Sequence, residues 1–132
     1  MIVKKLIEKA KQVREMAYAP YSNFKVGAAI ETDTGKVYTG CNVENASYAA
    51  TCCAERTALA NAIAEGERKF RRIAIVADTE GPCPPCGICR QVLYEFAPDI
   101  EVIMANTRDE TLVQTLDELM PHAFHSKKLR SR

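Results

Sequence analysis

The sequence lacks three features, each of which would indicate a particular class of protein. It contains no run of about 18 apolar residues, so it predicts no membrane-spanning helix. It has no excess of one charge, because 18 Lys and Arg are balanced by 17 Asp and Glu. A dedicated nucleic-acid binder has a much stronger positive field. Long polar or low-complexity tracts are also missing, which excludes an extensively disordered chain.

The N-terminus lacks the uninterrupted apolar region of a secretory signal, since charged and apolar residues alternate over positions 1–9. We therefore expect a cytoplasmic protein. The chain has 132 residues, 47% of them hydrophobic, which suits one domain with a substantial core. The sequence thus predicts a single domain over residues 1–132. Two basic clusters, 68–72 and 127–130, are expected to be solvated faces.

The spacing of apolar residues predicts alternating helices and strands. A 3.6-residue stripe indicates a surface helix at the N-terminus, whereas two later Ala- and Leu-containing segments are apolar enough to predict buried helices. Short apolar runs between turn residues predict strands. The result is an α/β fold, a three-layer α/β/α sandwich on a mixed sheet of about five strands. The expected helices run from the N-terminus to about Met16 and over Cys53–Glu65, Cys86–Phe96 and Leu116–Met120, and the expected strands over Val26–Ile30, Val37–Thr39, Ile73–Ala77, Glu101–Ala105 and, at the edge, Thr111–Gln114.

Cysteine is the unusual component of the sequence. Two of the six cysteines are adjacent and three recur at intervals of three residues, a crowding that does not suit disulfides. In a cytosolic protein, thiols gathered in this way are more typical of metal ligands or redox groups. The six are Cys41, Cys52, Cys53, Cys83, Cys86 and Cys89.

Two predicted helices begin with thiols. Cys53 precedes Glu55 and Arg56 in an otherwise apolar segment, and burying such charges is costly unless they pair or bind metal. Cys86 and Cys89 lie three residues apart and therefore share a helix face. Helix N-termini favour thiolates. Three thiolates can bind zinc with a fourth position open to water, but further cysteines could fill that position, so the count leaves a structural zinc site open.

Proline decides between the two Pro-Cys-x-x-Cys frames. The frame that ends at Cys86 has Pro84 and Pro85 between its cysteines, which prevents a helical turn with both thiols on one face. The frame that ends at Cys89 has its proline just before the helix, where proline is well tolerated. We therefore select Cys86 and Cys89 and interpret Cys83 as a loop thiol. Of the adjacent pair, Cys53 is the better ligand because it lies next to Ala54-Glu55.

Cys-Ala-Glu followed by Pro-Cys-x-x-Cys is the motif pair of zinc-dependent nucleobase deaminases, in a form with three cysteines. The sequence resembles the small cytidine deaminases of nucleoside salvage over nearly its whole length. Several separate motifs occur in the order of that family. They are Ala19-Pro20-Tyr21-Ser22-Asn23-Phe24, Val26-Gly27-Ala28-Ala29, the segment from Gly40 to Tyr48, Cys53-Ala54-Glu55-Arg56-Thr57-Ala58 and Pro85-Cys86-Gly87-Ile88-Cys89-Arg90-Gln91.

The resemblance implies hydrolytic deamination of cytidine, with 2′-deoxycytidine as an expected second substrate, to uridine or 2′-deoxyuridine and ammonia. One zinc ion per chain would activate water for attack at C4, and Glu55 would transfer protons. Three thiolates give zinc a net charge of −1 and weaken its acidity. Arg56 is expected to offset this by donating hydrogen bonds to thiolates.

The resemblance also implies the substrate contacts and a homotetramer with shared active sites. It assigns Asn42 and Glu44 to the ribose hydroxyls and Phe24 to the pyrimidine ring. It has Tyr48 and Phe124 reaching in from neighbouring subunits. Without the motif context, the three aromatic residues would be more typical of a core or an interface, and Glu44 of a solvated loop.

Two alternatives remain at this point. One is a deaminase for another base or for a nucleoside-like antibiotic. Action on polynucleotides is disfavoured by the balanced charge. The other is a structural zinc module that uses four cysteines, which leaves Glu55 at a buried helix start unexplained. Release of ammonia from cytidine separates these classes.

Overall fold

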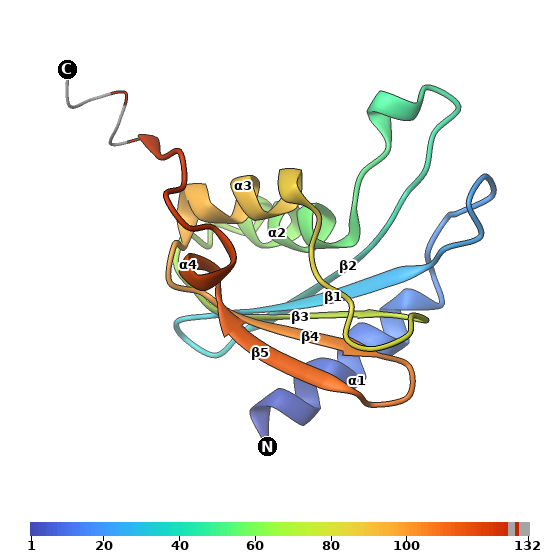
Figure 1. Cartoon of the computed structure of the whole chain (residues 1–132), viewed down its shortest axis with the longest axis horizontal. Helices are drawn as coiled ribbons and strands as arrows, with labels where there is room; N and C mark the ends of the chain where they lie inside the picture. The colour runs from blue at the N-terminus through green and yellow to red at the C-terminus, as the bar shows by residue number, and fades with distance from the viewer. Residues whose placement is uncertain (127–128, 130–132) are drawn as a thin grey trace.

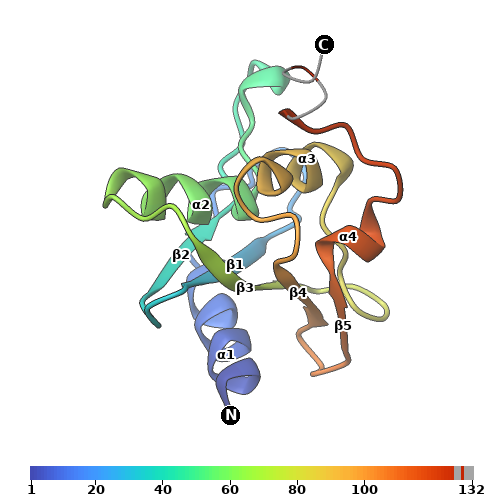
Figure 2. The same ribbon diagram turned by 90° about the vertical axis from the view of Figure 1, so that its left-hand side faces the viewer.

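A five-stranded sheet forms the middle layer of the molecule in the computed structural model, which describes residues 1–126 and 129. The strand order is β2-β1-β3-β4-β5. Helix α1 covers one face of the sheet, and α2 and α3 lie on the other (Figures 1 and 2). The predicted three-layer α/β/α sandwich is confirmed. The elements are α1 (Ile2–Arg14), β1 (Val26–Thr32), β2 (Val37–Cys41), the 3₁₀ turn η1 (Tyr48–Ala50), α2 (Ala54–Ala64), β3 (Phe70–Ala77), α3 (Gly87–Phe96), β4 (Glu101–Asn106), β5 (Thr111–Thr115) and α4 (Leu116–Leu119).

The sheet is mixed, as predicted. β3 and β4 are parallel and are connected through α3, whereas the other neighbouring pairs are antiparallel. β3 is the central strand, and its last five residues are fully buried because helices cover both faces. The alternation of side chains along the strands therefore builds two cores. Ile30, Ile73 and Ile75 face α2 and α3, and Ala29, Ala74 and Val76 face α1.

Two glycines allow helices to lie directly on the sheet. A Cβ atom at Gly27 would lie 2.0 Å from the carbonyl oxygen of Ala10 in α1. A Cβ atom at Gly40 would lie 2.3 Å from the backbone nitrogen of Ala58 in α2. These neighbours are backbone atoms and cannot rotate away. Gly40 thus fixes the first turns of α2 against β2, and this part of α2 begins the candidate site.

Two expectations about burial are wrong. The two helices predicted to be buried are covered on one face only in this chain, since Ala60 and Asn61 of α2 and Ile88 of α3 are exposed. Each helix packs on the sheet through one side, and an apolar composition does not show whether anything covers the other. The basic segment 68–72 is also not simply solvated. Phe70 is buried, and Arg72 of β3 donates to Glu31 of β1 and to Glu101 of β4.

Two segments project beyond the sheet on the side where β1 begins and β2 ends: residues 18–24 and 43–52, hereafter the projecting segments (Figure 1). Isolated bridges pair Tyr18 with Val43 and Val43 with Cys52, so the two segments are held together. Within the described part of the chain, no helix is long and apolar enough to cross a membrane. The predicted basic cluster 127–130 lies outside the described residues except for Leu129.

Candidate metal centre and active site

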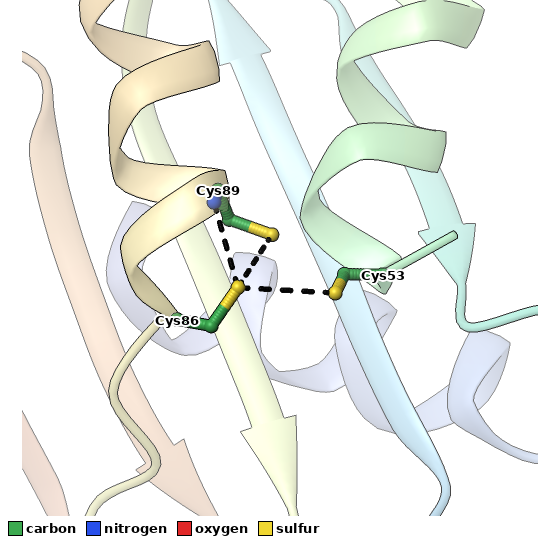
Figure 3. Close-up of side chains that lie close together, drawn as sticks. All are labelled: Cys53, Cys86 and Cys89. Atoms are coloured by element: carbon green, nitrogen blue, oxygen red, sulfur yellow. Dashed lines mark hydrogen bonds between the residues drawn. The ribbon is translucent and has the colours of Figure 1, made fainter. Parts of the chain in front are cut away.

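The N-termini of α2 and α3 bring three cysteines together. Cys53 and Cys86 are the N-cap residues of the two helices, and both have the extended backbone that precedes a first helical turn. Cys89 follows in the first turn of α3, and its N–H donates to the Cys86 sulfur. Figure 3 shows the three side chains pointing toward one another from the two helices. The ligand set predicted from the sequence therefore converges in space.

The sulfur positions fit a tetrahedral zinc ion. Zinc–sulfur bonds of about 2.3 Å place neighbouring sulfurs about 3.8 Å apart in a tetrahedral site. Here Cys86 Sγ lies 3.9 Å from Cys53 Sγ and 3.3 Å from Cys89 Sγ, and all three sulfurs lie within 4.8 Å of one another. Cys52 and Cys83 are not members of this cluster. Three sulfurs leave the fourth coordination position of a zinc ion to a non-protein ligand. This arrangement differs from a structural module in which four cysteines bind the metal.

The environment favours thiolate at the cluster. Hydrogen bonds from Cys89 and from the Arg56 guanidinium lower the pKa of the Cys53 thiol to about 5, against the opposing effect of burial. The pKa of Cys89 is raised, first by its hydrogen bond to Cys53 and then by burial. The hydrogen bonds to Cys53 thus favour its thiolate form in the metal-free cluster. A divalent cation would let all three sulfurs ionise.

Glu55 is a buried carboxyl group in the first turn of α2. The residue is only 4% exposed, and this burial is the main cause of the raised pKa of its carboxyl group. It lines a cavity of about 190 Å³ together with Cys53 and Cys86. A carboxyl group with this position can exchange a proton with a molecule held beside the sulfurs.

Arg56 approaches the same cluster. Its Nη2 donates to the carbonyl oxygen of Thr51 at 3.0 Å and lies 4.0 Å from Cys53 Sγ. The hydrogen bond to Cys53 is the main cause that raises the pKa of Arg56. Its buried Nε has no hydrogen-bond partner among the described residues. The guanidinium is therefore placed beside a thiolate rather than on an open helix surface.

Phe24 and Asn42 line the cavity on the side of the projecting segments. The Asn42 amide bonds the backbone on both sides of Lys25: its Nδ2 donates to the Phe24 carbonyl at 2.8 Å, and its Oδ1 accepts from Val26 N–H at 2.9 Å. Asn42 is buried, whereas Phe24 is 43% exposed. The amide thus holds the strand start from which the Phe24 ring reaches the cavity.

A second cavity of about 350 Å³ adjoins the first, because Thr51 lines both. Glu44 and Tyr48 line the second cavity. The Glu44 carboxylate accepts hydrogen bonds from the backbone of Tyr21 and Ser22, at 2.9 and 3.1 Å, and from the Ser22 hydroxyl group. These bonds, led by the one from the hydroxyl, lower the pKa of Glu44.

Tyr48 and Phe124 do not reach the cavity beside the sulfurs. Tyr48 is 78% exposed near the end of a projecting segment, with its ring 6.2 Å from that of Tyr21. Phe124 is 59% exposed beyond α4, where its carbonyl accepts from Gln91 Nε2. Within one chain, these two aromatic residues are therefore separate from the pocket.

Sequence reasoning missed several residues of the two cavities. Cys83 is buried and lines the first cavity, and burial followed by the charge of Glu55 raises the pKa of its thiol to about 11. Ser22 belongs to the motif Ala19–Phe24, but the sequence predicted no function for it. A serine that accepts from the N–H two residues on is a known local pattern, whereas its bond to Glu44 joins residues far apart in the sequence. The remaining unassigned lining residues are Val26, Thr51, Ala54, Ile75 and Pro84 of the first cavity and Tyr21 and Asn45 of the second.

Comparison with known proteins agrees with this geometry. Residues 2–105 match the model of the cytidine and deoxycytidylate deaminase zinc-binding region. The chain belongs to this family, and zinc is the metal of the matched region.

Relatives match over nearly the full chain. A cytidine deaminase of Sporosarcina psychrophila is 48% identical over 130 residues, covering 98% of this chain and 96% of the relative. One from Halalkalibacterium halodurans is 50% identical over 125 residues, covering 94% and 95%. The crystal structure of cytidine deaminase from Burkholderia pseudomallei superposes with a TM-score of 0.90 at 55% identity, covering 92% of this chain and 98% of that one.

Proposed function

We propose that the protein hydrolyses cytidine to uridine and ammonia, and that 2′-deoxycytidine is also a substrate. The observation behind this proposal is a cluster of three sulfurs from two helix N-termini, two of whose cysteines line a cavity together with the buried carboxyl group of Glu55. Relatives described as cytidine deaminases match nearly the full chain, which supports the same activity here. The residues 1–132 are proposed to act as one catalytic domain.

Cys53, Cys86 and Cys89 would hold the zinc ion. Zinc bound there supplies a Lewis acid that makes a water molecule nucleophilic near neutral pH. Glu55 accepts one proton from the attacking water and delivers it to the ring nitrogen, where it stays, and then transfers the second proton, from the new hydroxyl group at C4, to the leaving amine. Water adds at C4, the bond from C4 to the amine breaks, and ammonia leaves. Burial suits Glu55 to this work because a carboxyl group with a raised pKa can both take and give a proton.

Arg56 is proposed to moderate the charge of the three thiolates. Its guanidinium lies beside Cys53, and a hydrogen bond to a thiolate sulfur withdraws electron density from the metal–sulfur bond. This would partly restore the acidity that three anionic ligands remove from zinc. The bond to the Thr51 carbonyl orients the guanidinium for this contact.

The two cavities divide the recognition of a nucleoside. The first is lined by Cys53, Cys86, Glu55 and Phe24, and suits the base. Glu44 lies in a projecting segment and Asn42 directly precedes that segment, and both are proposed to contact the ribose hydroxyl groups. The Asn42 amide also positions the Phe24 ring indirectly, because it binds the backbone of Phe24 and Val26.

A nucleoside fits these cavities better than a nucleotide. The residues that line them include no lysine or arginine in the described part of the chain, and the second cavity contains the Glu44 carboxylate. A phosphate group needs positively charged or N–H donors, so a carboxylate disfavours it. We therefore expect little turnover of deoxycytidylate, the nucleotide substrate in the family's description.

We further propose a homotetramer in which Tyr48 and Phe124 complete the active sites of neighbouring subunits. Both residues are largely exposed and neither lines the first cavity of its own chain, which suits a role in another subunit. Tyr21 and Ile88 are also exposed large apolar residues. The cytoplasmic location stays a prediction.

The direct test is an assay of the zinc-loaded protein with cytidine, in which ultraviolet absorbance and released ammonia are followed together. The expected result is equal formation of uridine and ammonia, with much less activity on deoxycytidylate and on cytosine-containing oligonucleotides. Protein with full zinc that releases no ammonia from cytidine would contradict the proposal. Faster turnover of another amino-substituted base would indicate a deaminase of different specificity.

A further inference from the structure

The Ser22 hydroxyl group joins the residues proposed to recognise the two halves of the substrate. It donates to Glu44 Oε2 and accepts from the backbone N–H of Phe24 at 3.0 Å. Glu44 lines the second cavity, and the Phe24 ring lines the first. A single hydroxyl group thus lies between the carboxylate of one cavity and the aromatic wall of the other.

The backbone around Ser22 makes this bridge rigid. Asn23 has a left-handed conformation with φ of 58°, which turns the chain sharply between Ser22 and Phe24. The Asn23 N–H donates to the carbonyl of Ala19 at 3.0 Å. On the far side, Asn42 holds the Phe24 carbonyl. The Phe24 backbone is therefore held at its N–H by Ser22 and at its carbonyl by Asn42.

We propose that Ser22 is a positioning residue for nucleoside binding, which fixes the spacing between the Glu44 carboxylate and the Phe24 ring. This inference rests on the proposed function, because the substrate joins a base to a ribose at a fixed distance. A carboxylate and a ring on separate loops match that distance only if the loops are held in register. Ser22 provides this register without contacting the reacting atoms.

Removing the hydroxyl group leaves the rest of the turn in place. In Ser22→Ala, Glu44 Oε1 still accepts from the N–H groups of Tyr21 and Ser22. The Asn42 bonds to Phe24 and Val26 also remain. The variant loses only the donor to Oε2 and the acceptor for Phe24 N–H. We therefore expect it to fold, with a carboxylate free to rotate about its Oε1 contacts.

The experiment measures kcat and KM of wild type, Ser22→Ala and Ser22→Thr with cytidine and with 2′,3′-dideoxycytidine. A hydrogen bond to a charged group is worth enough that KM for cytidine should rise about 10-fold or more in Ser22→Ala. Loss of binding shared by ground and transition states leaves kcat nearly unchanged. For the dideoxy substrate, which lacks the ribose hydroxyl groups, the change in KM should be several-fold smaller. Ser22→Thr keeps the hydroxyl group and should restore KM.

Ser47→Ala is the matched control, because Ser47 lies on a projecting segment and its side chain makes no capping hydrogen bond. It should leave KM for both substrates unchanged. Equal losses on cytidine and dideoxycytidine, an unchanged KM, a fall in kcat alone, or no rescue by threonine would each overturn the positioning role.

The same experiment separates this inference from the proposed function. If the wild type deaminates cytidine and Ser22→Ala has the same KM as the wild type, the role of Ser22 is contradicted and the proposed function stands. If wild type deaminates no cytidine, the proposed function fails, and calorimetric binding of uridine then decides the role of Ser22. A rise in the uridine Kd of Ser22→Ala to match the KM effect supports the role, whereas equal affinity, or no uridine binding by wild type, overturns it.

Discussion

The metal centre and the projecting segments are built in different ways. The centre comes from two helix N-termini that lie against the sheet, with Cys89 and Glu55 buried. The projecting segments have few buried side chains and are held by polar contacts such as those of Ser22 and Glu44. From this difference we expect that chemistry and recognition depend on separate parts of the fold. Changes at the centre should affect zinc content and kcat, whereas loss of the polar contacts between Ser22 and Glu44 in the projecting segments should affect KM.

The largest effect is expected from Cys86→Ser. Serine is a poor zinc ligand beside two thiolates, so the site should lose its metal and the protein its activity. Cys52→Ser and Cys83→Ser are the matched controls, because neither cysteine belongs to the cluster. Metal analysis after dialysis should find normal zinc in both controls. Full zinc in Cys86→Ser, or an empty site in Cys83→Ser, would show that the ligand set is different.

Glu55→Gln should keep zinc and lose activity. General acid–base catalysis contributes roughly 10²–10⁴-fold, so kcat should fall by at least about 10². Glutamine has nearly the same shape and removes only the proton transfer. Zinc content and steady-state kinetics on one preparation provide the measurement. Near-normal turnover would exclude Glu55 as the group that transfers the proton.

Phe124→Ala tests whether a residue of a neighbouring subunit takes part in substrate binding. Base–aromatic stacking is worth about 1–3 kcal/mol, so kcat/KM should fall roughly 5- to 150-fold. Co-assembly of Phe124→Ala chains with Glu55→Gln chains then tests the sharing. Some hybrid sites would combine an intact Glu55 with a neighbour's intact Phe124, and activity should exceed that of the two variants mixed without exchange. Hybrids that assemble without gaining activity would contradict a shared site.

Gly40→Ala should affect the centre through packing. The added Cβ would lie 2.3 Å from backbone nitrogen in α2, and such overpacking typically costs about 1–3 kcal/mol of unfolding free energy. Gly87→Ala is the control, because no atom lies within 4 Å of its added Cβ. Urea denaturation of both variants measures the difference. Equal stability of the two would show that the contact between α2 and β2 relaxes easily.

Regular elements were predicted well because their apolar residues repeat with a clear period. All five strands and four helices occur near their expected positions, and the strands extend further where pairing continues beyond the apolar run. β3, for example, begins at Phe70 rather than Ile73, because Phe70 and Arg72 still pair with Thr32 and Glu31 of β1. The proline argument also selected the cysteines that converge, since a helix start fixes the directions of nearby side chains.

The sequence could not predict what depends on contacts between distant residues. Ser22 and Glu44 lie in two loops without any period, and their hydrogen bond exists only because bridges align the projecting segments. The exposure of Ile88 was missed because composition alone does not reveal whether the outer face of a helix has a neighbour. The role of Arg72 depends on strand register, which places it between Glu31 and Glu101.

The most direct measurement of the central claim is a zinc titration of metal-free protein, with turnover of cytidine followed at each addition. The account predicts no activity without metal, and a linear rise in ammonia release that ends at one zinc ion per chain. Glu55→Gln should bind the same amount of zinc and remain nearly inactive. Deamination by the metal-free protein, or a fully loaded protein that leaves cytidine unchanged, would contradict the account.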